Sequence, residues 1–461
     1  MTTNLPVRRR IADIARDAPD RPALIGFDAD LAEVALSWRE FADRVTETAG
    51  RTTGPYSVVE AANTVDAAVA IAAALAAEVP VFPLNPATPP AERDALLSQL
   101  ESRFDQEDHG VAYLLATGAS TGIPKIAARP GPLRYDPRRT PSLAIRQTGW
   151  RTGQRHLIVG PLYHAAPFTS FVDAILDANT VVLQRFFAPQ WTVDLIREHG
   201  VEWAQLTPTH MREILTTTPD PAHFDSLRAI LHTAAKCDDD TKRGWLELLG
   251  PKRVFELYGA TEGIGVTLAR GDEWLSRPGT VGRGVLTRIR IQDDTGRPTP
   301  PGTPGTVYLR TPNAITRADY LDRRTVRTTP DGFATVGDRG RLDEDGYLYL
   351  EPRAHDTINV GGEKVDPDEV EAALRHHHAV LDAVALAVPH ESLGSVVGVH
   401  VVLRPDKTAR RAELAAHCGR LLAGYKIPKH FTFVDQLPRT AAGKIQRWRL
   451  SPDSEGGAPP R

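Results

Sequence analysis

A run of glycine, hydroxyl and lysine residues near position 120 has the composition of a phosphate-binding loop. Leu114 and Leu115 indicate the end of a buried strand, and the loop follows directly after it. Glycines allow an anion to approach the backbone closely, hydroxyls donate hydrogen bonds, and an ammonium group offsets phosphate charge. The loop supplies these groups at Gly118, Ser120, Thr121, Gly122 and Lys125. A plain connecting turn of the same composition is the alternative interpretation.

The spacing within this loop excludes a P-loop ATPase. A Walker A loop has the pattern G-x-x-x-x-G-K-[ST], and its last hydroxyl contacts Mg²⁺. In this chain Lys125 does not follow Gly122 directly, and Ile126 stands where the hydroxyl residue would be. Pro124 also lacks the backbone N–H that a phosphate cradle would use. If this loop binds phosphate, it does so in a different way from a Walker A loop.

Alternating strand-like and helix-like segments must position this loop. Over about the first 350 residues, apolar strand-like runs occur at residues 155–160, 178–186 and 227–235. Helical patterns at residues 192–200 and 242–250 each end at a glycine. Because this alternation is typical of βαβ units, we expect an α/β fold with a large N-terminal domain of parallel sheets.

The pattern changes after residue 279. Short alternating strands broken by Gly, Pro and Asp predict antiparallel hairpins, or a small β-barrel-like part of the first domain, which we expect to cover residues 1–353. Residues 354–450 combine hairpin, helix and strand patterns and predict a smaller α+β domain. Residues 451–461 have little to bury and are predicted to be a disordered tail.

Composition is that of a globular protein and excludes several partner classes. The 461 residues suggest two or three domains, and the net charge of −3 gives no reason to expect nucleic acid as a partner. The longest apolar stretch, residues 67–77, is too short to span a membrane and predicts a buried helix. Two distant cysteines, Cys237 and Cys418, predict no disulfide framework, and no secretory signal is recognisable. We expect a cytoplasmic protein, and the sequence predicts no oligomeric state.

Five motifs occur in order along the chain. They are YLLATGASTGIPK (113–125), ELYGATEG (256–263), TVGDRGRLDEDGYLYL (335–350), PRAHDTINVGGEKVDPDEVE (352–371) and LPRTAAGKIQR (437–447). Over roughly residues 10–450 the chain thus resembles the adenylate-forming superfamily of acyl- and aryl-CoA ligases, peptide-synthetase adenylation domains and luciferases. Three further stretches, GPLYHAAPF, HTAAKC and GDEWLSRPGTVGR, resemble most the branch of bile-acid and steroid-side-chain acyl-CoA ligases.

This resemblance implies an ATP-dependent enzyme that joins a small carboxylic acid to a thiol. Residues 1–353 would form the adenylating, AMP-binding domain, and residues 354–450 a mobile lid that carries the catalytic lysine. The carboxylate would first attack the α-phosphate of Mg-ATP, and a thiol would then accept the acyl group. The expected cofactors are ATP and Mg²⁺, and the favoured thiol co-substrate is coenzyme A.

The resemblance also implies which residues contact the phosphates of ATP. In the second motif, Thr261 would bond the α-phosphate and Glu262 would bind Mg²⁺, with Thr121 as a further metal ligand. A strand-to-helix turn with a solvated Glu262 is the structural alternative. The β- and γ-phosphates would be held by the loop residues Thr117, Gly118, Ser120, Thr121, Gly122 and Lys125.

Further positions would bind the nucleoside. Tyr258 would stack on adenine, and Gly259, Ala234 and Ala235 would lie close to the nucleotide. By the same resemblance, Asp338 would accept hydrogen bonds from both ribose hydroxyls, although an Asp after Gly is otherwise ordinary turn chemistry. Arg353 would supply a permanent cation on the ribose–phosphate side.

The remaining functional candidates concern catalysis and the acceptor. By resemblance, Lys444 would enter the active site and stabilise charge as the acyl-adenylate forms, and His164 would line the acyl pocket. Gly361 and Gly362 would leave room for the pantetheine arm of coenzyme A, because a side chain would obstruct it. The alternatives are a half-buried structural histidine and a two-residue hairpin turn.

Departures from the superfamily pattern bear on the prediction of the acyl acceptor more than on the prediction of the adenylation step. His355 replaces an Asp or Lys of the hinge, and Lys236 replaces a proline common near adenine, before the acidic run 238–240. An amide synthetase or a nitrite-activating diazotase is therefore the alternative function. A non-catalytic nucleotide-binding relative is disfavoured because Lys444, Glu262 and the ribose-binding aspartate are all present.

Overall fold

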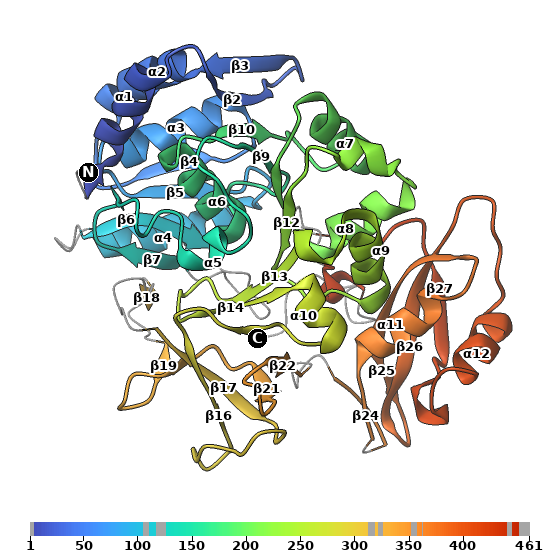
Figure 1. The fold of residues 1–461 in the computed structure, drawn as a ribbon. Helices are drawn as coiled ribbons and strands as arrows, with labels where there is room; N and C mark the ends of the chain where they lie inside the picture. The colour runs from blue at the N-terminus through green and yellow to red at the C-terminus, as the bar shows by residue number, and fades with distance from the viewer. Residues whose placement is uncertain are drawn as a thin grey trace. The chain divides into compact units, whose positions relative to one another are not determined.

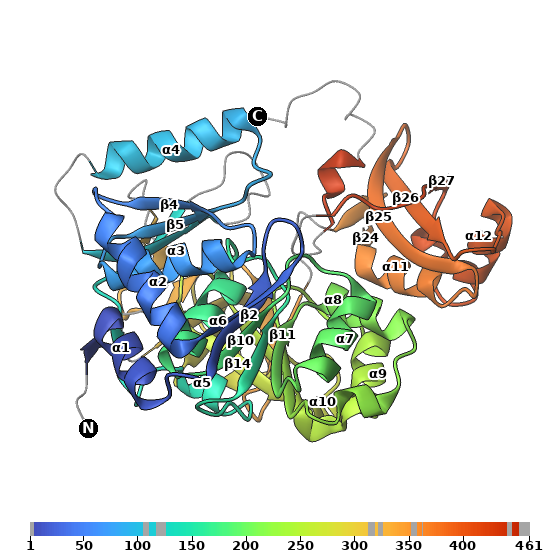
Figure 2. The same ribbon diagram turned by 90° about the horizontal axis from the view of Figure 1, so that it is seen from above.

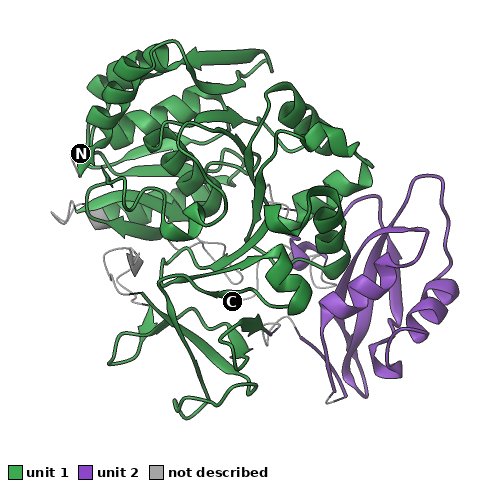
Figure 3. Ribbon diagram, in the orientation of Figure 1, with its two compact units in different colours: residues 1–350 green, residues 351–461 purple. Residues whose placement is uncertain are grey.

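The computed structural model describes residues 4–104, 110–116, 126–311, 319–320, 326–351, 357–361, 363–439 and 445–450. The predicted disordered tail, residues 451–461, lies outside these ranges. The chain divides into two compact units, residues 1–350 and residues 351–461 (Figure 3). Each unit has its own hydrophobic core.

The largest sheet of the first unit has nine strands (Figure 1). Their order is β15 (Arg283–Gly284), β14 (Val266–Arg270), β13 (Val254–Gly259), β12 (Ala229–His232), β11 (Trp203–Leu206), β9 (Arg155–Ile158), β10 (Thr180–Leu183), β2 (Pro22–Phe27) and β3 (Glu33–Ser37). The six strands from β13 to β2 are parallel, and the outer strands are antiparallel. The strands that the sequence placed at residues 155–160, 178–186 and 227–235 are all in the parallel part.

Helices cover both faces of this sheet (Figures 1 and 2). Leu231 belongs to one core cluster and its neighbour Ile230 to the other, because successive strand residues point to opposite faces. The first cluster contains residues of α1 (Val7–Asp17), α2 (Trp38–Arg51), α3 (Val65–Ala76) and α6 (Ala165–Leu176). The second contains residues of α7 (Pro189–Glu198), α8 (Pro208–Thr216) and α9 (Asp239–Leu249). This arrangement confirms the predicted α/β fold.

A second sheet carries the strand that precedes the predicted phosphate loop. Its strands are β18 (Asp319–Tyr320), β7 (Ile126–Pro130), β6 (Val111–Ala116), β5 (Val81–Leu84) and β4 (Ser57–Glu60), in that order. Leu114 and Leu115 of β6 are 0% and 3% exposed, as expected for a buried strand end. The apolar stretch at residues 67–77 is the buried helix α3, which precedes β5 as predicted.

The third sheet of the first unit has six antiparallel strands. Five lie in the order β19 (Arg327–Thr328), β20 (Ala334–Thr335), β17 (Gly305–Arg310), β21 (Arg339–Leu342) and β22 (Leu348–Leu350), and β16 (Arg288–Gln292) pairs with β17. The antiparallel hairpins predicted after residue 279 are therefore present. Among the described strands, no pairing closes this barrel-like part into a complete barrel.

The second unit is a mixed α+β fold. Its sheet has the order β24 (Glu363–Val365), β23 (Ile358–Val360), β26 (Gly394–Leu403) and β25 (Val380–His390), and β27 (His430–Phe433) pairs with β26. The unit also contains α11 (Pro367–Arg375), α12 (Arg411–Gly419) and the short 3₁₀ helices η4 (Gly424–Lys426) and η5 (Arg447–Arg449).

The remaining elements of the first unit are short connections, apart from one long helix. They are β1 (Leu5–Pro6), β8 (Arg134–Tyr135), α4 (Pro90–Phe104), α5 (Leu143–Arg146), α10 (Gly271–Ser276) and the 3₁₀ turns η1 (Pro221–Phe224) and η2 (Pro251–Arg253). Within the ranges described above, we find no helix with the length and apolar character that crossing a bilayer requires.

Candidate active site

The predicted nucleotide residues gather at the carboxyl edge of the nine-stranded sheet. Ala234 and Ala235 follow β12, whereas Tyr258 and Gly259 end β13, and Thr261 lies two residues beyond it. Strands β12 and β13 are parallel neighbours, so these segments leave the sheet at the same edge. Ligands of open parallel sheets bind outside the carboxyl ends of the strands. The fold thus brings two separate sequence motifs to one edge.

A hydrogen bond joins two motifs that are far apart in the sequence. The Tyr258 hydroxyl donates to Oδ2 of Asp338 at 2.8 Å, across 80 residues of chain. Asp338 precedes β21, and its backbone carbonyl accepts a hydrogen bond from the Val307 amide of β17 at 2.8 Å. The aspartate is therefore held by the six-stranded sheet while its carboxylate reaches the nine-stranded one.

The turn after β13 holds Glu262 in a confined place. This carboxylate side chain belongs to a residue that is only 8% exposed. A Cβ at Gly265, three residues further, would lie 2.6 Å from the Thr287 side chain, so the backbone approaches its neighbours closely here. Mg²⁺ in ATP-dependent enzymes is usually held by one or two carboxylates together with the substrate phosphates. One shielded carboxylate at the strand end fits this requirement.

The segment after β12 has an unusual backbone. Ala234 has a φ of +79°, a conformation that costs energy for any residue with a Cβ. Ala235 and Lys236, which follow it, are exposed. Such strain at a strand end is characteristic of ligand-binding segments.

A buried ion pair lies behind the two strand ends, and the sequence analysis did not identify it. Lys242 of α9, 1% exposed, donates to the carboxylate of Glu256 on β13. Burial, together with this ammonium group, lowers the pKa of His232 on the adjacent strand well below its ordinary value. Burial also raises the pKa of the Cys237 thiol well above its usual range. The pair fixes α9 against the strand that carries Tyr258. The sequence signal that could have indicated this pair is a lysine, Lys242, on the apolar face of the helix predicted at residues 242–250.

His164 lies at the amino end of α6, after β9. It occupies the cap position without making a capping hydrogen bond, and its ring is 4.7 Å from that of Tyr163, measured between centroids. Burial raises the pKa of Tyr163 to about 12, so this phenol stays protonated. Because β9 is parallel to β11 and β11 to β12, His164 follows a strand that ends at the same sheet edge.

Gly361 belongs to the second unit and forms a hairpin turn. Val360 of β23 pairs with Glu363 of β24, and Gly361 between them has a φ of +60°. A Cβ added to Gly361 would lie 3.0 Å from Leu393 Cδ2. Gly361 thus lies in a hairpin turn, and its backbone conformation favours glycine whether or not the turn also contacts an acceptor.

The other predicted site residues belong to segments outside the described ranges. Lys444, Arg353, Gly362 and the phosphate-loop residues lie outside the described residues, and so does His355. The loop residues concerned are Thr117, Gly118, Ser120, Thr121, Gly122 and Lys125. Within the described part of the chain, no group of three or more His, Cys, Asp or Glu side chains could hold a metal ion by itself.

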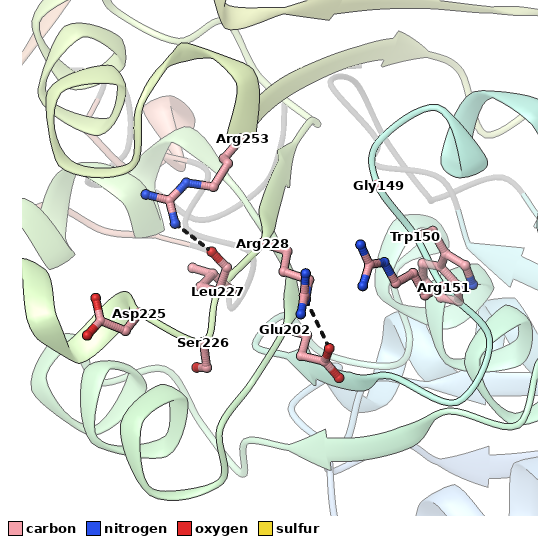
Figure 4. A pocket seen from close by; sticks show the side chains of 9 residues that line it. All are labelled: Gly149, Trp150, Arg151, Glu202, Asp225, Ser226, Leu227, Arg228 and Arg253. Atoms are coloured by element: carbon pink, nitrogen blue, oxygen red, sulfur yellow. Dashed lines mark hydrogen bonds and ion pairs between the residues drawn. The ribbon is translucent and has the colours of Figure 1, made fainter.

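A separate polar pocket of about 740 Å³ lies in the first unit (Figure 4). Inside it, Arg228 donates to Glu202 at 3.2 Å and Arg253 donates to the Leu227 carbonyl at 3.1 Å. These residues precede β11, β12 and β13, so the pocket is at the amino edge of the sheet, away from the nucleotide residues. Its lining residues are Gly149, Trp150, Arg151, Glu202, Asp225, Ser226, Leu227, Arg228 and Arg253.

Comparisons with known proteins relate the chain to AMP-binding enzymes. The model of the AMP-binding enzyme family matches residues 102–317, and that of the AMP-binding enzyme C-terminal domain matches residues 369–444. A fatty acid–[acyl-carrier-protein] ligase of Streptomyces coeruleorubidus is 31% identical over 394 residues, covering 80% of this chain and 75% of the relative. A 2-succinylbenzoate–CoA ligase of Bacillus pumilus is 28% identical over 380 residues, covering 81% and 74%.

A solved structure supports the same relationship at the level of the fold. The o-succinylbenzoate CoA synthetase of Bacillus subtilis, in complex with its acyl-adenylate intermediate, matches with a TM-score of 0.78 and 23% identity. The match covers 100% of each chain. Together with the ordered motifs, two of which meet through Tyr258 and Asp338, these similarities show that the chain belongs to the superfamily of adenylate-forming, AMP-binding enzymes.

Proposed function

We propose that the protein is an ATP-dependent acid–thiol ligase that works in two steps. A carboxylate oxygen attacks the α-phosphorus of ATP, which forms an acyl-adenylate and releases pyrophosphate. A thiol sulfur then attacks the acyl carbon, which forms a thioester and releases AMP. Joining two anions requires neutralised phosphate charge and fixed geometry, which is what the motifs at the sheet edge can supply.

The hydrogen bond between Tyr258 and Asp338 is the observation that carries this proposal. It places an aromatic ring beside a carboxylate that can accept both ribose hydroxyls, at the edge where parallel sheets bind nucleotides. In this proposal Tyr258 stacks on adenine, Ala234, Ala235 and Gly259 line the base, and Thr261 bonds the α-phosphate. Arg353 contacts the ribose–phosphate side.

The charge of the triphosphate would be offset by Mg²⁺ and by the loop after β6. Glu262 and Thr121 are the residues that would hold the metal ion. Mg²⁺ would stabilise negative charge on the phosphates as they separate. Loop residues 117–125 contact the β- and γ-phosphates, and Lys444, carried by a lid domain over residues 354–450, stabilises charge during adenylation.

Coenzyme A is the favoured thiol. One relative described above is named as a ligase for coenzyme A and the other as a ligase for an acyl carrier protein. Both names therefore give a thiol as the acyl acceptor. Lys236, which is exposed beside the base segment, is the described departure that favours the alternative function, an amide synthetase or a nitrite-activating diazotase. The narrower resemblance to bile-acid and steroid-side-chain ligases stays a prediction.

A panel assay tests the proposal. Pyrophosphate release is measured with ATP, Mg²⁺ and a range of carboxylic acids, with and without coenzyme A or amines. We expect at least one acid to support pyrophosphate release. Without coenzyme A, release should stop after about one turnover, and with coenzyme A it should continue and yield thioester. Turnover that requires an amine or nitrite, with no thioester from any acid, would instead assign the chain to the amide synthetase or diazotase class.

Asp338→Ala is expected to weaken ATP and AMP binding alike, by roughly 10- to 100-fold. Hydrogen bonds to a charged group contribute about 1.5–3 kcal/mol, and a ribose contact is present with either nucleotide. Tyr258→Phe is the matched control, because it removes the hydroxyl that donates to Asp338 at 2.8 Å and keeps the ring. It should change both affinities less. Calorimetric titration measures both, and AMP affinity equal to wild type in Asp338→Ala would disprove the ribose role.

A further inference from the structure

The two ends of the segment that contains Lys444 are paired with each other. Arg439 and Ile445 form an isolated antiparallel bridge, and the Gln446 amide donates to the Pro438 carbonyl at 2.8 Å. Residues 440–444 therefore connect two chain positions that are fixed side by side. In the sequence, Lys444 directly precedes one of these two positions, Ile445.

Arginines at both ends bind acidic side chains of the unit's core. Arg439 donates to the carboxylate of Asp382 at the start of β25. Arg447 makes two such contacts. Its Nη1 lies 2.8 Å from Oε1 of Glu371 on α11 and also donates to the Ala385 carbonyl at 2.7 Å. The two ends are thus attached to α11 and β25, which pack against each other in the same unit (Figure 2).

Glu371 is the centre of this attachment. The residue is 5% exposed, and its Oε1 also accepts a hydrogen bond from the Ala385 amide at 3.0 Å. Burial raises the pKa of this carboxyl group, and the Arg447 guanidinium is the main group that opposes the rise. A carboxylate in such surroundings keeps its charge only beside a close cation. Arg447 and Glu371 therefore depend on each other.

From this geometry we propose that Arg447 and Glu371 are positioning residues for Lys444. Arg447 is three residues after Lys444 in the sequence, and it ties the following chain to a buried carboxylate at the helix–strand junction. Transition-state stabilisation by a lysine depends on its placement, and a displacement of about 1 Å can cost about 100-fold in rate. The proposal rests on the proposed function, in which Lys444 acts in adenylation only.

The network contains a natural control for a purely structural role. Arg375 on α11 lies near the same carboxylates, with its Nη1 3.8 Å from Glu371 Oε2 and 3.9 Å from Asp382 Oδ1. It belongs to the helix itself and not to the chain ends around Lys444. Removing either Arg375 or Arg447 takes one positive charge from the surroundings of the buried carboxylate, but only the loss of Arg447 removes a contact of the chain end that follows the lysine.

The test compares Arg447→Ala, Arg447→Lys, Glu371→Gln and Arg375→Ala in the full-length protein. We expect Arg447→Ala and Glu371→Gln to lower kcat for pyrophosphate release about 10- to 100-fold, with little change in the KM for ATP. Thioester formation from a supplied acyl-adenylate should be retained. Arg447→Lys should recover part of the rate, and Arg375→Ala should stay close to wild type. Equal losses in Arg375→Ala and Arg447→Ala, or losses that follow the melting temperature, would overturn the proposal.

A double-mutant cycle with Lys444→Ala separates this proposal from the function it rests on. If Arg447 acts through Lys444, Arg447→Ala should cause no further loss of rate in the Lys444→Ala background, because the two changes remove the same interaction. Multiplicative losses would overturn the positioning role while leaving the function intact. If Lys444→Ala alone has the wild-type rate, it is the proposed function of the lysine that fails.

Discussion

Lys444→Ala is expected to lower the rate of acyl-adenylate formation by two or more orders of magnitude. As the carboxylate attacks, negative charge builds up on the α-phosphate, and a placed ammonium group stabilises that charge more than it stabilises bound ATP. Loss of one such transition-state donor typically costs about 100- to 1,000-fold in rate. The measurement is single-turnover pyrophosphate release with saturating acid and ATP.

Three controls make this result specific. ATP should bind Lys444→Ala nearly as well as wild type, because Tyr258 and Asp338 remain in place. A supplied acyl-adenylate should still be converted to thioester, because the lysine is not needed in the second step. Lys407→Ala removes the same charge from an exposed position of the same unit and should leave the rate unchanged. Undiminished pyrophosphate release by Lys444→Ala would refute the assignment.

Much of the fold could be predicted because its elements are determined by local patterns. Continuous apolar runs such as residues 180–183 suit strands buried on both faces, and β10 is buried at every position. The helix α3 was predictable because an apolar stretch with Thr64 as its cap has a local start signal. The order of the motifs indicated the site, and the bond between Tyr258 and Asp338 confirms that two of them meet.

Features that depend on contacts between distant segments could not be predicted in the same way. The ion pair of Lys242 and Glu256 requires that α9 pack against β13, and a sequence pattern does not give that pairing. The positive φ of Ala234 is imposed by its surroundings, since alanine itself disfavours it. The contact of Arg447 with Glu371 likewise depends on how the end of the second unit returns to α11.

Gly362→Leu is expected to block thioester formation while leaving the first half-reaction nearly intact. The glycine pair connects Val360 of β23 to Glu363 of β24, and Gly361 already adopts a φ of +60°. If coenzyme A passes beside this turn, a leucine at the second position would obstruct its pantetheine arm, and the first half-reaction does not need coenzyme A. We expect pyrophosphate release in a single turnover close to the wild-type rate, with thioester formation at least about tenfold slower, a loss of about 1.4 kcal/mol or more in transition-state stabilisation.

A fold defect could imitate this result, so the controls must exclude it. Gly361→Leu is unsuitable, because its positive φ and the Leu393 side chain at 3.0 Å oppose any larger residue. Gly424→Leu is the matched control, since a Cβ there has nothing within 4 Å and the residue belongs to the same unit. It should form thioester at the wild-type rate, and both variants should keep the wild-type melting temperature. If Gly362→Leu forms thioester as fast as wild type, the acceptor does not pass this turn. If the wild-type enzyme turns over only with an amine or nitrite, the adenylation chemistry stands, and the acceptor is not a thiol.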